Sequence, residues 1–361
     1  MPLEEPSWWY GAGGERMKRL LGPASRIFAR FATRRLTQRT PYRSRLPVIC
    51  VGNFTAGGTG KTPLTIHIAQ VLAKAGEHPA ILTRGYGGKR AGPYWLDDIS
   101  ELAEDVGDEP LLLARAAPTM VAHNRRAGAI AIETSGRGIT VIVMDDGLQN
   151  PSLAKDLTLA VVDAARGLGN GEVIPAGPLR APLDVQLGLT DAIVLNTPPN
   201  AADAAEGSDA APPALLLLEA LRRDFPGPVI AASAEAATEA GALTGAPLVA
   251  FAGIANPARF FALLERLGGR IAAHLVFKDH HAYSESDAER LLALAVTHGA
   301  KLVTTEKDHV RLVGYGGARE RLAKAATALP IRLAFSEQDG HRLSELVTTA
   351  ALTGGYRRWL R

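Results

Sequence analysis

The sequence predicts an α/β protein with three parts: a lobe built on a parallel sheet, a second, smaller α/β lobe and an N-terminal amphipathic helix. Three observations carry this prediction. The 361 residues suffice for roughly two domains. A short apolar strand over 47–52 leads through a glycine-rich loop into a helical segment over 63–75, the strand–loop–helix order of α/β units. Apolar, β-branched runs at 140–144, 247–252 and 301–305 are typical of buried strands.

The overall composition is that of an ordinary globular protein. Hydrophobic residues make up 47% and charged residues 21% of the chain, close to average usage. No apolar run approaches the ~18–20 residues that a membrane-spanning helix needs. The single cysteine, Cys50, excludes an intramolecular disulfide and predicts a reducing, cytosolic compartment.

The first 45 residues form a basic arm. They hold ten Lys or Arg and three Glu, which gives a net charge of +7. Because the whole chain has a net charge of +3, the remaining residues have a net charge of −4. If residues 17–35 form a helix, apolar residues such as Ile27 and Phe31 lie within an arc of about 120° on its surface, beside arginines. We expect Pro23 to open a helix ending near Gln38. The pattern fits a helix lying in an anionic membrane interface or, equally, one packed on the body; a nucleic-acid-binding arm is a weaker alternative.

A phosphate-binding loop follows the first strand. Its residues are Thr55, Ala56, Gly57, Gly58, Thr59, Gly60, Lys61 and Thr62. Small residues let backbone N–H groups turn toward the phosphates of ATP, while Lys61 reaches the β- and γ-phosphates and Thr62 ligates Mg²⁺. Thr55 replaces the first glycine of the usual G-x-x-x-x-G-K-[ST] pattern. The loop resembles that of partitioning and division-site ATPases, but Ala56 stands where that class carries a signature lysine.

Two further loops after strands carry candidate site residues. Asp145 and Asp146 follow the strand over 140–144, at the strand end where nucleotide-bound Mg²⁺ is usually held. The pattern favours a metal role for at least one of them over two loop acids beside a turn. Arg84 and Tyr86 lie in a glycine-rich loop after another strand and are candidates to face a substrate, unless this loop is only a surface connection.

Two acidic segments have ordinary local explanations. Asp108 and Glu109 stand at the start of a helix, where acids cap the first turn and complement the helix dipole. The Asp-His-His segment 279–281 precedes a helix whose start is marked by Ser286 and Glu289 at capping-box spacing. From the residues alone, caps or surface positions are favoured over catalytic or metal-binding roles.

Taken together and in order, the motifs resemble those of the tetraacyldisaccharide 4′-kinases, which phosphorylate a membrane-embedded acylated glucosamine disaccharide in lipid A biosynthesis. The matching segments are 51–63, 84–87, 107–110, 145–149, 169–171 with 175–180, 277–280 and 305–308, together with the basic arm. Most of these motifs are individually weak, whereas their order and spacing are highly specific.

This resemblance implies an ATP- and Mg²⁺-dependent kinase that converts tetraacyldisaccharide 1-phosphate to lipid IVA at the cytoplasmic face of the bacterial inner membrane. It implies that Asp108 takes the proton from the sugar hydroxyl and that His280, from the second lobe, orients Asp108 when the lobes close. Lys61 and Thr62 then serve phosphate and Mg²⁺, and Glu109 supports the metal region of Asp145 and Asp146. The implied substrate residues are Arg84, Tyr86, Arg126, Gln149 and Arg180.

The expected organisation is an arm over 1–45, a P-loop kinase lobe over 46–196, an Ala/Pro-rich linker over 197–214 and a second lobe over 215–361 that contributes His280. The expected partners are the lipid substrate and an anionic membrane surface, with no nucleic acid and no obligate protein partner inferred. The alternative function is a membrane-associated regulatory P-loop ATPase of the partitioning type, which hydrolyses ATP without phosphorylating a small molecule.

Overall fold

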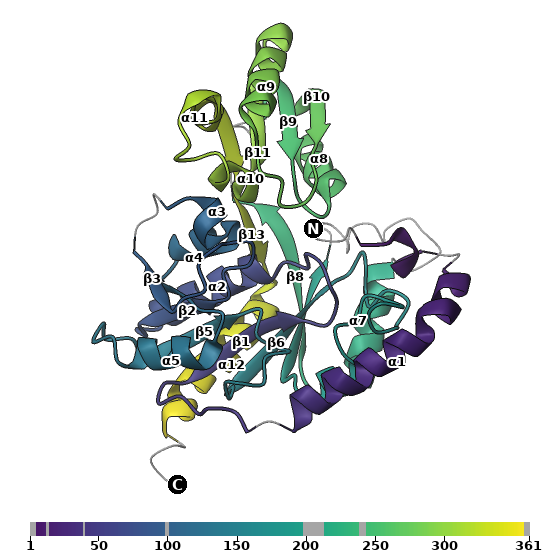
Figure 1. The fold of residues 1–361 in the computed structure, drawn as a ribbon, viewed down its shortest axis with the longest axis vertical. Helices are drawn as coiled ribbons and strands as arrows, with labels where there is room; N and C mark the ends of the chain where they lie inside the picture. The colour runs from purple at the N-terminus through teal and green to yellow at the C-terminus, as the bar shows by residue number, and fades with distance from the viewer. Residues whose placement is uncertain are drawn as a thin grey trace. The chain divides into compact units, whose positions relative to one another are not determined.

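The computed structural model describes residues 5–11, 14–38, 40–97, 101–197, 213–237 and 243–356. Most of the predicted linker, 198–212, lies outside the described residues. Figure 1 traces the chain from the N-terminus to the C-terminus. The chain divides into two compact units. Unit 1 comprises 1–83, 124–234 and 333–361, and unit 2 comprises 84–123 and 235–332.

Six strands of unit 1 lie side by side and parallel, in the order β8-β7-β6-β1-β5-β2. Their bounds are β1 Val48–Asn53, β2 Pro79–Thr83, β5 Val141–Asp145, β6 Leu157–Asp163, β7 Ala192–Thr197 and β8 Val229–Ala236. Every residue of β1, β2, β5 and β6 is buried, as expected for apolar strands covered on both faces. Parallel strands end at one edge, so the polar residues that close β1, β5 and β7 share that edge.

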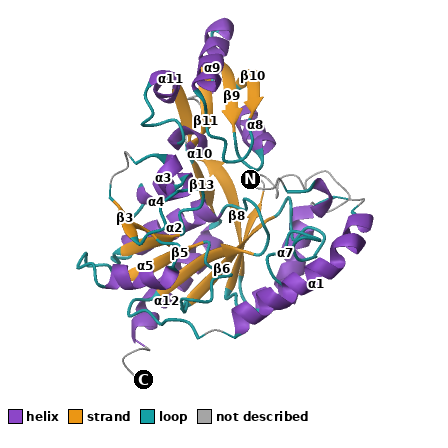
Figure 2. Ribbon diagram, viewed as in Figure 1, coloured by secondary structure: helices purple, strands orange, loops and turns teal. Residues whose placement is uncertain are grey.

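Helices cover the sheet of unit 1 (Figure 2). Their bounds are η1 Ser7–Trp9, α1 Glu15–Thr37, α2 Lys61–Lys74, α5 Arg125–Glu133, α6 Leu183–Leu187, α7 Pro213–Asp224 and α12 Glu337–Tyr356. Helix α2 packs on β1, β2 and β5, and α12 packs on β1 and α2. Leu218 and Leu221 of α7 join Ile193 and Leu195 of β7 in an apolar core.

The predicted N-terminal amphipathic helix is confirmed as α1, although it is longer than expected. It begins at Glu15 and runs through Pro23, rather than beginning there. Pro23 lies on an exposed stretch, where water can satisfy the carbonyl that loses its intrahelical partner. The helix is tied down by the buried Ser25, whose hydroxyl donates to the Val173 carbonyl oxygen at 2.6 Å. No helix in the described ranges is both long enough and apolar enough to cross a bilayer.

Unit 2 contains a four-stranded parallel sheet in the order β10-β9-β11-β12 and an antiparallel pair, β3 with β4. The strands are β3 Tyr94–Leu96, β4 Thr119–Val121, β9 Pro247–Ala252, β10 Arg270–Val276, β11 Lys301–Thr305 and β12 Ala326–Leu329, and β13 Ile331–Ala334 leads back to unit 1. The helices are α3 Ala103–Val106, α4 Asp108–Ala114, α8 Pro257–Arg266, α9 Glu285–His298, α10 Glu306–Val310 and α11 Gly317–Ala325.

The two faces of the four-stranded sheet bury separate cores. Phe251 points into a cluster with Leu291 of α9 and Leu322 of α11. Its neighbour Ala250 points to the opposite face, into a cluster with Leu264 of α8. Successive strand residues alternate between faces, so one apolar strand serves both layers of helices. The predicted α/β fold class, with a large parallel sheet and a second α/β part, is confirmed.

The division into units differs from the predicted continuous lobes over 46–196 and 215–361. The segments 215–234 and 333–361 belong to unit 1, because β8 pairs with β7 and α12 packs on β1. The segment 84–123 belongs to unit 2, because α4 packs against α10 and shares an apolar cluster with Val310. Both units are therefore discontinuous in sequence.

Helix α9 begins earlier than predicted. Ser284, not Ser286, is the cap: its hydroxyl accepts from the Asp287 N–H at 3.1 Å, and the Asp287 carboxylate accepts from the Ser284 N–H at 2.9 Å. The same carboxylate lies 3.0 Å from Nε2 of His281. This additional contact favours the earlier of two possible capping boxes.

Candidate active site

The phosphate loop has the conformation that its glycines predict. The loop connects β1 to α2, which begins at Lys61. Gly57 and Gly60 have φ values of 90° and 98°, in the left-handed region that glycine adopts without strain. A Cβ on Gly60 would lie 2.7 Å from Nδ2 of Asn196, so this position also leaves no room for a side chain.

Three side chains hold the carbonyl oxygens of the loop. Asn53 donates through Nδ2 to the Thr55 oxygen at 2.7 Å, and Arg180 donates through Nε to the same oxygen at 3.0 Å. Asn196, near the end of β7, donates to the Thr59 oxygen at 3.2 Å. These side chains bind the carbonyl oxygens on the protein side of the loop. This favours a loop conformation whose backbone N–H groups point to the opposite side, which is the arrangement that binds a phosphate.

The loop contains buried polar atoms that suit a polar ligand. The Oγ1 atom of Thr59 and Oδ1 of Asn53 are buried without a hydrogen-bond partner in the described structure. Unpaired buried oxygens are costly, and a bound nucleotide with its hydration shell offers donors. Thr62, in the first turn of α2, supplies the hydroxyl that the loop pattern assigns to Mg²⁺. The residues present thus fit ATP and Mg²⁺.

The two adjacent aspartates have different surroundings. Asp145, the last residue of β5, accepts from the hydroxyls of Thr65 at 3.2 Å and Thr83 at 3.1 Å. Asp146 has a positive φ of 47° and pairs with Arg180 at 2.7 Å and with Lys61 at 3.8 Å. Hydroxyl donors thus orient Asp145 beside the start of α2, whereas cations neutralise Asp146.

The pKa of Asp146 reflects this ion pairing. Burial opposes its ionisation, but the charges of Lys61 and Arg180 outweigh burial and hold the pKa well below its usual range. Asp146 is therefore an anion at neutral pH.

The predicted substrate residues of unit 1 separate into two places. Gln149 and Arg180 lie together. The side-chain amide of Gln149 donates to the backbone carbonyl oxygen of Asn53 at 2.7 Å, and a guanidinium nitrogen of Arg180 lies 3.4 Å from the side-chain oxygen of Gln149. Both brace the phosphate loop. Arg126, on α5, instead stacks its guanidinium over the Tyr42 ring at 5.4 Å.

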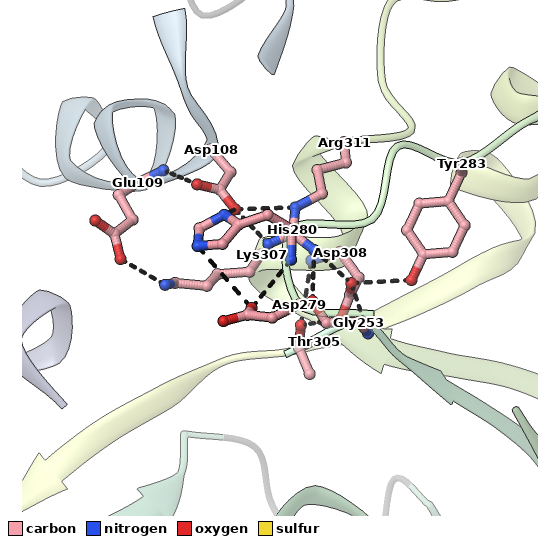
Figure 3. A network of polar contacts seen from close by, with 10 residues as sticks. All are labelled: Asp108, Glu109, Gly253, Asp279, His280, Tyr283, Thr305, Lys307, Asp308 and Arg311. Atoms are coloured by element: carbon pink, nitrogen blue, oxygen red, sulfur yellow. Dashed lines mark hydrogen bonds and ion pairs between the residues drawn. The ribbon is translucent and has the colours of Figure 1, made fainter. Parts of the chain in front are cut away.

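A second polar cluster lies within unit 2, around Asp108 (Figure 3). Asp108 is the first residue of α4 and is 5% exposed. Its Oδ1 accepts from the Glu109 N–H at 2.9 Å, and its Oδ2 lies 3.0 Å from Nδ1 of His280. The Oδ2 atom also accepts from Nε of Arg311 at 2.9 Å and from Nη2 of the same side chain. Both carboxylate oxygens are therefore engaged.

His280 is held in an uncommon backbone conformation beside Asp108. Its φ is 57°, and its N–H donates to the Gly253 oxygen at 3.2 Å and to Oδ1 of Asp279 at 3.0 Å. The Tyr86 ring meets the imidazole edge-on, with centroids 5.5 Å apart. The structure thus brings the predicted residues Asp108, His280 and Tyr86 together in one unit. This replaces the expectation that His280 reaches Asp108 from another lobe.

Burial opposes charge on Asp108, but the His280 hydrogen bond and the Arg311 and Lys307 charges hold its pKa well below the usual range. The same hydrogen bond raises the pKa of His280 above its ordinary value, against the opposing effect of burial. The pair therefore favours an ionised carboxylate beside an imidazole that binds its proton more tightly than usual.

Glu109, predicted near the metal, pairs with Lys307 at 2.6 Å within unit 2. The other predicted metal residues, Thr62, Asp145 and Asp146, all belong to unit 1. No group of three His, Cys, Asp or Glu residues in the described ranges has metal-binding geometry. Residue pattern alone missed Arg311 and Asn196. A polar residue at the end of a buried strand was an available signal for Asn196.

The fold and the loop together define a P-loop nucleotide-binding α/β protein. A family model described as Tetraacyldisaccharide-1-P 4'-kinase matches residues 17–350, and the chain belongs to this family. It is 44% identical to the tetraacyldisaccharide 4'-kinase of Parvibaculum lavamentivorans, over 91% of this chain and 93% of that protein. It is also 44% identical to an enzyme of that name from Methylorubrum extorquens, over 96% and 99% of the two chains.

Among solved structures, the fold is similar to a crystal structure of LpxK from Aquifex aeolicus in complex with ATP. The TM-score is 0.68 at 23% sequence identity, covering 92% of this chain and 99% of that one. At this identity the likeness establishes the fold. The resemblance read from the motifs is confirmed, and the regulatory ATPase alternative is not favoured.

Proposed function

We propose that the chain transfers the γ-phosphate of ATP to the 4′-hydroxyl of tetraacyldisaccharide 1-phosphate, giving lipid IVA. Membership of the kinase family carries this proposal. The phosphate loop supports the ATP half of the reaction, and the hydrogen-bonded Asp108–His280 pair supports the hydroxyl half. The product then carries phosphate at both ends of the disaccharide.

On the donor side, Lys61 and the loop amides bind the phosphates. Thr62, Asp145 and Asp146 would hold Mg²⁺, since hydroxyl and carboxylate oxygens are its preferred protein ligands. When bound, Mg²⁺ supplies charge neutralisation on the β- and γ-phosphate oxygens. Arg180 braces the Thr55 carbonyl and neutralises Asp146, so it acts on the loop as well as being a candidate for the substrate.

On the acceptor side, Asp108 takes the proton of the sugar hydroxyl as the new P–O bond forms. Three donors on Oδ2 make Asp108 a weak base. A weak base suffices because phosphoryl transfer passes through a loose transition state in which the nucleophile loses its proton late. His280 fixes the carboxylate through Nδ1, and Tyr86 packs on the imidazole.

The substrate is a lipid, and α1 offers a surface for its membrane. Leu20, Ile27 and Phe31 are 72%, 57% and 69% exposed. Exposed apolar side chains on a helix rich in arginine fit a helix lying in an anionic interface. The chain is thus proposed to bind peripherally to the cytoplasmic face of the inner membrane.

Vesicle binding tests this arm. An Ile27→Ser/Phe31→Ser variant should bind phosphatidylglycerol-containing vesicles at least tenfold more weakly, because each large apolar side chain contributes ~1.5–3 kcal/mol on full burial. Val296→Ser is the matched control, since Val296 is 82% exposed on α9 in unit 2. Equal loss in both variants would contradict a role specific to α1.

The activity itself is tested with purified protein, detergent-dispersed tetraacyldisaccharide 1-phosphate and γ-labelled ATP. Label should appear in a bis-phosphorylated lipid, and Asp108→Asn should abolish transfer while leaving ATP binding within about twofold. Absence of labelled lipid, together with ATP hydrolysis stimulated by vesicles lacking acceptor, would instead support the regulatory ATPase.

A further inference from the structure

The Thr305–Asp308 motif has no part in the function proposed above, yet Thr305, Lys307 and Asp308 belong to the cluster drawn in Figure 3. Thr305 ends β11 and caps α10: its hydroxyl accepts from the Asp308 N–H at 3.1 Å. The cap fixes the first turn of the helix. Arg311 lies one turn beyond Asp308, at the i, i+3 spacing that lets the two side chains meet.

Asp308 is fully buried and is anchored by several donors. Oδ1 accepts from the Gly253 N–H at 2.9 Å and the Tyr283 hydroxyl at 2.9 Å, and Oδ2 accepts from the Thr305 hydroxyl at 2.6 Å. The donors come from β11, from the end of β9 and from the residue before the cap of α9. This carboxylate is therefore a fixed point in unit 2.

Arg311, only 7% exposed, connects that fixed point to Asp108. Its Nη1 donates to Oδ1 of Asp308 at 2.9 Å and to the Gly253 oxygen at 2.7 Å. Its Nε and Nη2 both donate to Oδ2 of Asp108. One edge of the planar guanidinium thus contacts Asp308 and another contacts Asp108, the proposed base. These two aspartates are 200 residues apart in the sequence.

A buried Asp–Arg–Asp arrangement is a poor device for stability alone. Removing three charges from water is costly, and apolar replacements of buried ion pairs are often neutral or stabilising. The geometry it provides is specific, because a guanidinium has donors in a rigid fork whereas a lysine offers a single charged point. Orientation of Asp108 accounts for the arrangement better than stability does.

We propose that Arg311, held by Asp308, is a positioning residue that fixes the carboxylate of Asp108 for proton acceptance. The proposal rests on the assigned role of Asp108. Through Oδ2, Arg311 and His280 hold the carboxylate from two sides, so that its rotation about the Cβ–Cγ bond is restricted. The motif over 305–308 thus supports the acceptor side of the reaction from within unit 2.

Steady-state kinetics of Arg311→Lys and Arg311→Ala test the proposal. Misplacement of a reacting group by about 1 Å can cost ~10²-fold in rate. We expect kcat to fall roughly 10²-fold in Arg311→Ala, with KM for ATP and for the lipid acceptor within about threefold of the original values. Arg311→Lys should recover only part of this loss, because it restores the charge without the fork.

Chemical rescue separates positioning from general damage. Methylguanidinium at millimolar concentration should raise kcat of Arg311→Ala at least tenfold and should leave Asp108→Asn unchanged. Arg319→Ala is the matched control: Arg319 also lies in unit 2, pairs with Glu285 at 3.0 Å and stacks on Tyr315, and its loss should leave kcat unchanged.

The variants also distinguish failure of this inference from failure of the proposed function. If Asp108→Asn abolishes transfer while folded Arg311→Ala and Arg311→Lys keep kcat within threefold, the positioning role is wrong. If Asp108→Asn retains transfer, the assignment of the base is wrong. Should Arg311→Ala not fold, as judged by its thermal melt and ATP binding, Arg311→Lys decides. A kcat for Arg311→Lys equal to the original overturns the proposal.

Discussion

Replacing Gly60 by alanine should weaken ATP binding far more than it weakens the fold. Gly60 has φ 98° and ψ 23°, a left-handed conformation that costs a non-glycine residue ~1–2 kcal/mol. The new Cβ would also lie 2.7 Å from Nδ2 of Asn196, displacing a side chain that bonds the Thr59 oxygen, at a further cost of about 1 kcal/mol.

The two costs together are about 2–3 kcal/mol, and each 1.4 kcal/mol is a factor of ten in affinity. Alanine therefore shifts the loop away from the conformation that binds phosphate, and the apparent Kd for ATP should rise roughly 30- to 140-fold. Isothermal titration calorimetry with a non-hydrolysable ATP analogue measures this directly.

Gly76→Ala is the control for backbone strain. Gly76 has a similar φ of 89°, but nothing lies within 4 Å of an added Cβ. It follows α2 and takes no part in the phosphate loop, so its replacement should lower thermal stability while leaving the Kd unchanged. A Gly60→Ala variant that binds the analogue within threefold of the original protein would refute the assignment of this loop conformation to phosphate binding.

Three further outcomes are expected. The pKa of His280, measured by NMR titration of its imidazole, should fall in Asp108→Asn, because the hydrogen bond to Asp108 raises it and the remaining effect of burial lowers it; an unchanged pKa would contradict the contact. Burial raises the pKa of the Cys50 thiol to about 11, so iodoacetamide at pH 8 should label it only on unfolding, and rapid labelling of the folded protein would mean that β1 is not buried as described. The Glu5 carboxylate lies against Gly57 of the phosphate loop and pairs with Arg166 at 2.8 Å. Because its negative charge repels the phosphates of ATP, the Glu5→Gln variant should bind ATP up to about fivefold more tightly at low salt, whereas Glu15→Gln on exposed α1 should not. Equal ATP affinities of the two variants would mean that the Glu5 charge does not act on the loop.

The phosphate loop was predictable because its function depends on local order in the sequence. A buried strand, small residues, Lys61 and Thr62 are contiguous, and the same short segment forms both the turn and the site. Asp145 was predictable for a related reason, since a polar residue that ends an apolar strand must lie at the sheet edge.

The acceptor-side cluster was only partly predictable, because it depends on pairing between distant segments. The resemblance supplied Asp108 and His280, but periodicity and spacing carry no record that Arg311 would reach Asp108. The unit boundaries could not be predicted for the same reason. They depend on the packing of α4 on α10 and the pairing of β8 with β7, and the order of residues in the sequence reveals neither contact. The start of α9 was ambiguous even locally, since two serines each precede an acid by three residues.

The two carboxylates that the proposed reaction needs are each neutralised inside their own unit. In unit 1, Asp146 pairs with Lys61 and Arg180. In unit 2, Asp108 pairs with Arg311 and His280. The two proposed half-sites therefore depend on separate sets of charge partners. The loss of either partner set should thus impair one half-site and spare the geometry of the other.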